Sequence, residues 1–255
     1  MKSLNAFFRK ELIEGIRTHK FVIIIAAIMF FAVADPAMLK LLPQILKSQM
    51  EMIDISKMKF DQYAAMANYT KDLFQISTFV IILALSGLIA GEKSNKTLTI
   101  PVSMGCDVYG IVGGKFLLYG IFLSISSMVG MLTAYYYSGI IFGNSFDIIP
   151  ALKAGVLFGL YFLFVLSIVN FYSSFFSKAF MAGIMSLVTI YLMRAVEGFV
   201  NFKMFFPTYI LGDASAFESG LQSDTIVSIT VALLAIVALN LFAVLKLKRT
   251  ELSNG

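Results

Sequence analysis

The chain has 255 residues, of which 59% are hydrophobic and 14% are charged, and its mean hydropathy is +0.86. Because soluble domains carry about 25% charged residues, this composition excludes an ordinary soluble enzyme, a disordered protein and a disulfide scaffold. The net charge of +5 would suggest nucleic acid as a partner of a soluble protein, but here we expect basic residues at one membrane face. The composition predicts a single transmembrane domain over residues 1–255 with no nucleic-acid partner.

Six apolar segments are candidates for membrane-spanning helices, which need about 20 residues each. The first, Phe21–Ala34, is short, and it spans only if its helix begins near Ile16 or continues through a kink at Pro36 to Leu42. The other five run over about Leu73–Gly91, Phe116–Ser138, Ala151–Tyr172, Ala179–Val200 and Thr225–Leu245. The sequence thus predicts an all-α polytopic membrane protein with six transmembrane helices.

The distribution of lysine and arginine predicts the orientation of these helices. With the N-terminus inside, residues 1–20, 92–115, 173–178 and 246–255 are cytoplasmic and hold 12 basic residues, against 7 in the outer segments. Cytoplasmic loops of membrane proteins carry the excess of positive charge. We therefore expect both termini in the cytoplasm.

Residues 1–20 contain an amphipathic helix. Apolar residues recur every four positions on one face: Leu4, Phe8, Leu12 and Ile16. The other face is mostly basic and holds Lys2, Arg9, Lys10, Glu14 and Arg17. This pattern favours a helix lying in the lipid headgroup region, in contact with the bilayer. The alternative is a solvated cytoplasmic helix that merely precedes the first span.

Two outer segments are too long or too apolar to be plain loops. Residues 36–72 are rich in methionine at helical spacing, which predicts one or two helices lying on the outer face as an extracellular segment. They form either a structural cap, which we favour, or a surface for apolar cargo. Residues 201–224 begin with an apolar stretch that predicts a re-entrant or interfacial extracellular segment.

The cytoplasmic loop 92–115 is long for a connection between two helices. Pro101 is suited to the first turn of a short helix, because its missing N–H is not needed there. Val102, Met104 and Val108 would give that helix an apolar docking face. The alternative is an ordinary connecting loop.

Few polar residues lie inside the predicted spans. Arg194 and Glu197 share a face of the fifth helix, either as a local ion pair or as part of a translocation path or outer gate. Asn170 and Asn240 are expected to form hydrogen bonds between helices.

Small residues form a stripe on the second span, at Ala84, Gly87 and Gly91, which suits close packing within the chain or a dimer seam. One cysteine, Cys106, excludes an intramolecular disulfide, and one histidine, His19, excludes a histidine-based metal cluster within the chain. No catalytic motif and no nucleotide-binding loop of the GxxxxGK[ST] kind occurs, so we expect no enzyme activity, catalytic residue, metal or cofactor in this chain.

Four short motifs follow the second span: Gly91-Glu92, Thr97-Leu98, Pro101-Val102-Ser103 and Gly114-Lys115. Together with the order of the spans, they resemble the permease subunits of bacterial type-2 ATP-binding-cassette (ABC) exporters. Lys96 stands where that family often has glycine, and Gly105-Cys106 where it often has arginine.

The resemblance implies a location in the bacterial cell membrane, a second permease chain in a homodimer or heterodimer, and two copies of a separate cytoplasmic ATPase that binds ATP and Mg²⁺. Residues 92–110 would form the coupling helix that docks on this ATPase. The implied contacts are Glu92 and Lys93 by charge, with Thr97, Leu98, Pro101, Val102, Ser103, Met104 and Val108 along the docking segment. The cargo would be apolar or amphipathic, such as a peptide, a drug or a lipid-like molecule.

Two other functions remain compatible with the sequence. One is an ATP-independent ion or secondary transporter, for which more paired charges or broken helices in the membrane are expected. The other is a membrane-bound assembly or sensor subunit that transports nothing.

Overall fold

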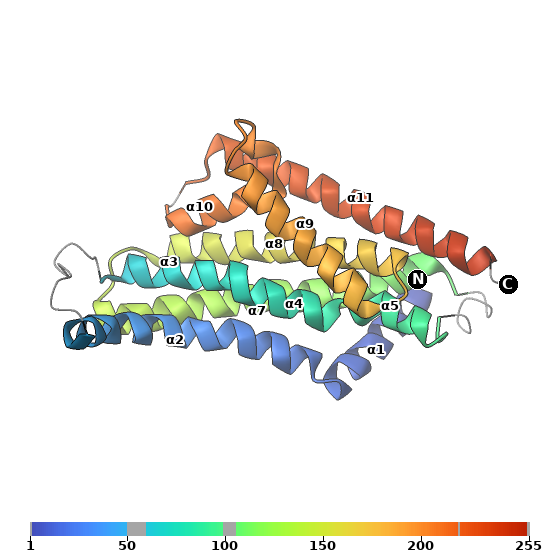
Figure 1. The fold of residues 1–255 in the computed structure, drawn as a ribbon, viewed down its shortest axis with the longest axis horizontal. Coiled ribbons are helices and arrows are strands. Elements are labelled where there is room, and N and C mark those ends of the chain that lie inside the picture. Colours follow the sequence, from blue (N-terminus) through green and yellow to red (C-terminus); the bar gives the residue numbers. More distant parts are fainter. Residues whose placement is uncertain (1, 50–59, 99–105, 219, 254–255) are drawn as a thin grey trace.

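The computed structural model describes residues 2–49, 60–98, 106–218 and 220–253. Within these ranges every regular element is helical, and six helical stretches are long and apolar enough to cross a membrane. The predicted all-α, six-span architecture is therefore confirmed. Both chain ends lie at the same end of the bundle (Figure 1), which we call the termini end, and the opposite end is the distal end.

The N-terminal region forms two helices joined by a sharp corner. Helix α1 (Lys2–Arg17) corresponds to the predicted amphipathic helix, and α2 (Lys20–Gln49) contains the first span. His19, at the corner, adopts a left-handed backbone conformation with φ of 57°. Helix α2 continues through Pro36 and Pro43, which is the second of the two extensions expected for the first span.

The second spanning stretch is made of four helical pieces. They are α3 (Gln62–Asp72), a π-helical turn η2 (Leu73–Ser77), α4 (Thr78–Leu85) and α5 (Gly87–Ser94). Asp61 begins the stretch by accepting a hydrogen bond from the Ala64 amide at 2.8 Å, which satisfies a backbone donor that the helix leaves free.

The described part of residues 36–72 is largely helical, as predicted, but its helices are continuous with spanning helices. The described part of this segment extends α2 as far as Gln49 and begins α3 at Gln62, so both pieces continue spanning helices. The two prolines in α2 cost it backbone hydrogen bonds but do not end it. Around Pro36, the side chains of Ala32 and Leu39 are buried and support the helix on both sides.

The remaining elements complete the bundle. They are α7 (Val108–Phe142), α8 (Ile148–Phe175), α9 (Ala179–Glu197), η3 (Lys203–Phe205), η4 (Pro207–Tyr209), α10 (Ile210–Ala216) and α11 (Ser223–Ser253). The predicted excursion over 201–224 thus folds into short helices, and α10 packs against α8 and α3 at the distal end.

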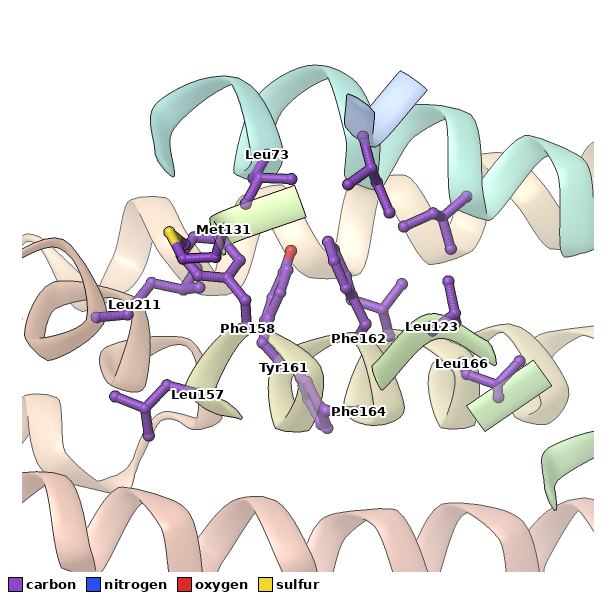
Figure 2. Packing of buried hydrophobic residues seen from close by; sticks show 14 of the residues in the cluster. Leu73, Leu123, Met131, Leu157, Phe158, Tyr161, Phe162, Phe164, Leu166 and Leu211 are labelled. Atoms are coloured by element: carbon purple, nitrogen blue, oxygen red, sulfur yellow. The ribbon is translucent and has the colours of Figure 1, made fainter. Parts of the chain in front are cut away.

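Helix α8 forms the centre of the bundle and packs against α7, α9, α10 and α11. Its aromatic side chains Phe158, Tyr161 and Phe162 are fully buried and point toward neighbouring helices (Figure 2). The Tyr161 hydroxyl, which would be costly to bury alone, lies 3.2 Å from the Thr78 hydroxyl. Leucine, isoleucine and phenylalanine remain exposed on the outer faces of α2, α7 and α11, as expected for lipid-facing surfaces.

We predict that Gly130→Ala destabilises the bundle by about 1–3 kcal/mol, because overpacking forces neighbouring atoms to move. A Cβ at this position of α7 would overlap the Tyr69 hydroxyl and lie 2.5 Å from Cγ2 of Ile28. Gly91→Ala is the matched control, since a Cβ there meets nothing within 4 Å. Thermal unfolding in detergent should show a lower midpoint for Gly130→Ala only. Equal midpoints for the two variants would contradict the packing described.

Candidate functional site

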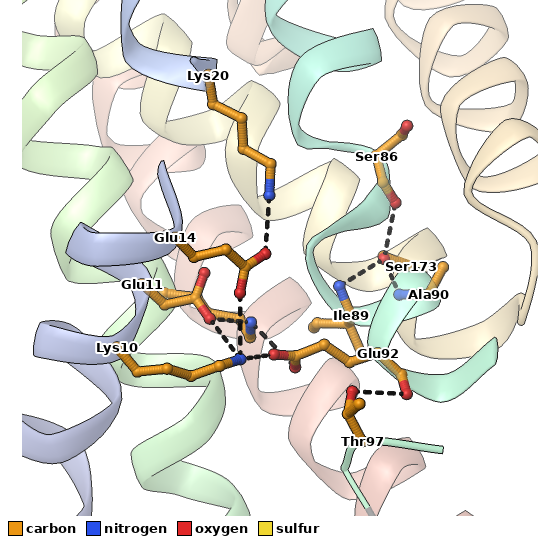
Figure 3. Close-up of polar contacts among 11 residues, drawn as sticks. Lys10, Glu11, Glu14, Lys20, Ser86, Ile89, Ala90, Glu92, Thr97 and Ser173 are labelled. Carbon is orange, nitrogen blue, oxygen red and sulfur yellow. Dashed lines mark hydrogen bonds and ion pairs between the residues drawn. The ribbon is translucent and has the colours of Figure 1, made fainter. Parts of the chain in front are cut away.

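Six charged side chains meet where α1, α2, α5 and α7 come together at the termini end. Three are lysines and three are glutamates, so their formal charges cancel. They are Lys10, Glu11, Glu14, Lys20, Glu92 and Lys115, which we call the charge network (Figure 3).

Lys115 on α7 is the most deeply placed member of this network. Its side chain and that of Glu11 are fully buried, and the two form an ion pair. The same ammonium lies 3.0 Å from Oε2 of Glu92 on α5. A buried charge is tolerated only when opposite charges compensate its lost hydration, so Lys115 links α1 and α5 to the third span.

Lys10 on α1 forms a second centre of the network. Its ammonium is paired with Oε1 of Glu92, and it lies 3.3 Å from Oε1 of Glu11 and 3.4 Å from Oε2 of Glu14. Lys20 completes the set across the corner between α1 and α2, with 3.2 Å between its Nζ and Oε1 of Glu14.

The three carboxylates are close enough together to hold a metal ion. The ammonium of Lys10 contacts all three of them, and their charge is already balanced by lysines. This donor set therefore does not call for a metal ion, and we expect the network to act as a structural joint.

The network shifts the pKa values of two of its three α1 members, Lys10 and Glu14. Burial would raise the pKa of Glu14, but the ammonium groups of Lys20 and Lys10 outweigh it and hold this pKa below its ordinary value. Burial would lower the pKa of Lys10, but its hydrogen bond to Glu92 and the nearby carboxylates raise it instead. Both groups are thus kept charged in the folded chain.

Helix α1 reaches the network because α7 has glycine where the two helices cross. A Cβ at Gly114 would lie 3.1 Å from the Leu4 carbonyl oxygen and 3.1 Å from Cβ of Phe7. Gly114 therefore permits close approach, and the adjacent Lys115 supplies the charge. The Gly-Lys pair that carries part of the family resemblance thus forms the docking site of α1.

Helix α5 is held by α8 as well as by the network. The helical pattern of the chain is interrupted at Ser86. The Ser173 hydroxyl of α8 accepts hydrogen bonds from the backbone amides of Ile89 (3.1 Å) and Ala90 (2.7 Å). It donates a hydrogen bond to the Ser86 carbonyl (3.0 Å; Figure 3). Backbone groups at a helix break need such partners in an apolar environment. Lys93 extends the link by donating to the Ser174 carbonyl at 2.7 Å.

Glu92 and Val108, two of the residues expected to contact an ATPase, face inward in this chain. Glu92 is 8% exposed and its carboxylate points into the charge network, because two lysines compensate it there. Val108 is buried in an apolar cluster with Leu98, Phe7 and Leu247, among others. These residues hold the two ends of the loop and do not form its outer surface.

Other members of the expected coupling segment lie at the exposed end of α5 or outside the described residues. Thr97 is exposed, and its amide and hydroxyl donate to the Glu92 carbonyl at 3.0 and 3.2 Å, which closes the end of α5. Exposed Lys96 follows α5 with φ of 56°. Pro101, Val102, Ser103 and Met104 lie outside the described residues.

The small-residue stripe of the second stretch packs within the chain at two of its three positions. A Cβ at Gly87 would lie 3.6 Å from Cβ of Ala179 on α9, and Ala84 packs against the main core. Gly91 has open space beside it. The contact made by Gly87 is therefore intramolecular.

Arg194 and Glu197 form the expected pair, with 2.6 Å between Nη1 and Oε1. Thr208 from η4 donates its hydroxyl to Oε2 of Glu197 at 2.6 Å, and its carbonyl accepts from Arg194 at 3.3 Å. These bonds attach the segment after α9 to that helix and match the interpretation as a local ion pair. The Asn170 amide donates to the Asn240 side-chain oxygen at 3.2 Å, which confirms the predicted bond between spans.

We predict that Lys115→Met lowers the free energy of unfolding by about 3–5 kcal/mol, because Glu11 and Glu92 stay buried without one of their cations. Adding Glu11→Gln should recover part of the loss. Arg9→Met, on the exposed face of α1, is the control and should change stability by no more than ~0.5 kcal/mol. Denaturant unfolding in detergent measures all three variants, and equal stability of Lys115→Met and Arg9→Met would refute the role of the network.

Acid should weaken the docking of α1 on the rest of the bundle while leaving helix α8 protected. Glu14, whose pKa is lowered in the folded chain, stabilises docking above the ordinary carboxyl pKa of 4.5, and this contribution is lost as the pH falls through the lowered value. Lys10, whose pKa is raised, stabilises the docking of α1 at all pH values below its ordinary pKa of 10.5. We expect faster amide hydrogen exchange in residues 2–17 at about pH 3 than at about pH 7, after correction for the intrinsic rate. Helix α8 is the internal control, and unchanged protection of α1 would contradict this mechanism.

Comparison with known proteins places the chain only at the level of its membrane architecture. No protein-family model matches it. It is similar to a protein of Bacillus subtilis (strain 168) described as the uncharacterized transmembrane protein YxlG, with 24% identity over 174 residues. The matched region covers 67% of this chain and 66% of that protein, just under two thirds of its length. The six apolar helices and this similarity together identify the chain as a multi-pass membrane protein.

Proposed function

We propose that this chain is the membrane permease subunit of an ATP-driven exporter, paired with a second permease chain and coupled to two copies of a separate ATPase. The observation that carries the proposal is the ion pair between Lys115 and Glu92, 3.0 Å apart. These residues belong to Gly91-Glu92 and Gly114-Lys115, the first and last motifs of the family resemblance. Two motifs that are separate in sequence therefore meet at one joint, as expected if they serve one function.

In this proposal the termini end is the cytoplasmic face of the bacterial cell membrane. The loop between α5 and α7 lies there, and both of its described ends are fixed in the same apolar cluster by Leu98 and Val108. The exposed residues 94–97 and the segment 99–105 would provide the contact with the ATPase. Glu92 would act as a positioning residue that keeps the loop in register with α1.

Movement of the ATPase would pass to the spans through these fixed ends. A displacement of the loop would act on α5, on α1 through Glu92, and on α8 through Ser173 and Lys93. The ATPase would bind ATP and Mg²⁺ and supply the energy, and this chain would form the path for an apolar or amphipathic substrate.

The ATP-independent transporter is the second candidate. The buried carboxyl of Asp35 in the first spanning helix favours it, because secondary transporters place ionisable groups within their spans. Cargo transport by the purified permease in proteoliposomes without any ATPase would select this candidate.

Co-purification tests the exporter proposal directly. We expect the ABC ATPase encoded beside this gene to co-purify with the full-length chain. Val102→Asp should reduce the ATPase recovered by roughly tenfold or more, because it would place an unpaired charge in a desolvated contact. Val102→Ile is the matched control and should recover as much ATPase as the parent chain.

Two results would count against the proposal. If no ATPase is encoded nearby and none co-purifies, the exporter function is rejected. If Val102→Asp retains full recovery and normal ATP-dependent transport while the chain inserts normally, the coupling assignment of this loop is rejected.

A further inference from the structure

A cavity of about 470 Å³ lies near the distal end, between α2 and the junction of α3 with η2. Its lining has charged and apolar parts. Asp35 of α2 and Asp72 of α3 contribute carboxyl groups, the exposed side chain of Lys71 also lines it, and Met38, Leu41 and Leu42 contribute an apolar wall. The volume falls in the range typical of sites for small organic ligands.

The carboxyl of Asp35 has no counter-charge in an ion pair within the described part of the chain. The residue is 7% exposed, and its Oδ2 has no hydrogen-bond partner there. It is hydrogen-bonded to the carboxyl of Asp72, and the described residues, Lys71 of the same lining included, provide no ion pair to either group. Two adjacent carboxylates repel each other unless a proton lies between them, so a positively charged ligand that takes the place of this proton would stabilise both.

The backbone on both sides of the cavity is irregular. Asp35 precedes Pro36, whose missing N–H leaves the Ala32 carbonyl without its usual helical partner. Asp72 precedes the π-helical turn η2, a kind of distortion frequent at functional sites. Gln75 in this turn lines the cavity, and its carbonyl accepts a hydrogen bond from the Tyr191 hydroxyl at 2.6 Å. Both irregularities are thus part of the packed structure.

We propose that this cavity binds an organic monocation, with its positive group between Asp35 and Asp72 and its apolar part against Met38, Leu41 and Leu42. A small metal ion fits the site less well, because Ca²⁺ requires six to eight oxygen ligands and much of this lining is apolar. The proposal deepens the exporter function by naming lipophilic cations as its cargo class. It rests on that function only in treating the ligand as cargo.

Binding to the permease alone tests the site. The full-length chain is placed in nanodiscs of neutral phosphatidylcholine without an ATPase, and equilibrium dialysis measures tetraphenylphosphonium. Tetraphenylborate, an anion of the same shape, controls for nonspecific apolar binding, and empty nanodiscs control for partition into lipid. We expect saturable binding of the cation at one site per chain and no such binding of the anion.

Substitutions then assign the cation site to the carboxyl pair. Asp35→Asn and Asp72→Asn should each weaken tetraphenylphosphonium binding by roughly tenfold or more, because each removes one charge from the pair. Asp61→Asn is the matched control: it removes the same charge at the start of α3, outside this cavity, and asparagine also caps helices. This control should bind like the parent chain.

Three outcomes would overturn the proposal: no saturable cation binding by the parent chain, equal site binding of the anion, or parent-like affinity in both Asp35→Asn and Asp72→Asn. Thermal unfolding shows whether each variant is folded, and half-buried Asp72 provides a second test if Asp35→Asn is unstable. Absence of an ATPase would reject the exporter function but leave this assay intact. Failure of this assay beside a co-purifying ATPase would reject only the cation site.

Discussion

The fully buried ammonium of Lys115 is the constraint on which the termini end of this protein depends. An ion at this depth must keep its counter-charges, and Glu11 and Glu92 supply them from two different helices. Satisfying one charge therefore fixes the position of α1 against α7 and the register of α5. The glycine that precedes Lys115 makes this possible, because only a small residue lets α1 come so close.

The spans and the N-terminal helix were predictable because their signals are local. An apolar run or a four-residue repeat needs no knowledge of distant residues. The charge network was not predicted, since Lys10 and Glu92 are 82 residues apart and Lys115 and Glu11 are 104 apart. Glu92 was consequently assigned to an outer surface. Extension of α2 beyond Pro36 was one of two alternatives, because tertiary packing decides whether a helix tolerates proline.

Buried charge is treated in two ways in this bundle. In the charge network each carboxylate has a lysine partner, and the network joins α1, α2, α5 and α7. At the distal end Arg194 and Glu197 are similarly paired, whereas Asp35 adjoins another carboxyl group. We thus regard charged residues that find an opposite charge within the chain as structural. We regard the carboxyl pair that finds none as a site for a ligand. This difference leads us to place the joint at one end and the cargo site near the other.

The sequence separation within the charge network also has a consequence for biosynthesis. Helix α1 leaves the ribosome about a hundred residues before Lys115, so Glu11 must wait for its partner while the first two spans are being made. During that interval α1 has no α7 to cross, and within the chain it can pack only against α2. The N-terminal helix can therefore dock in its final position only after the third span has been synthesised and inserted into the membrane.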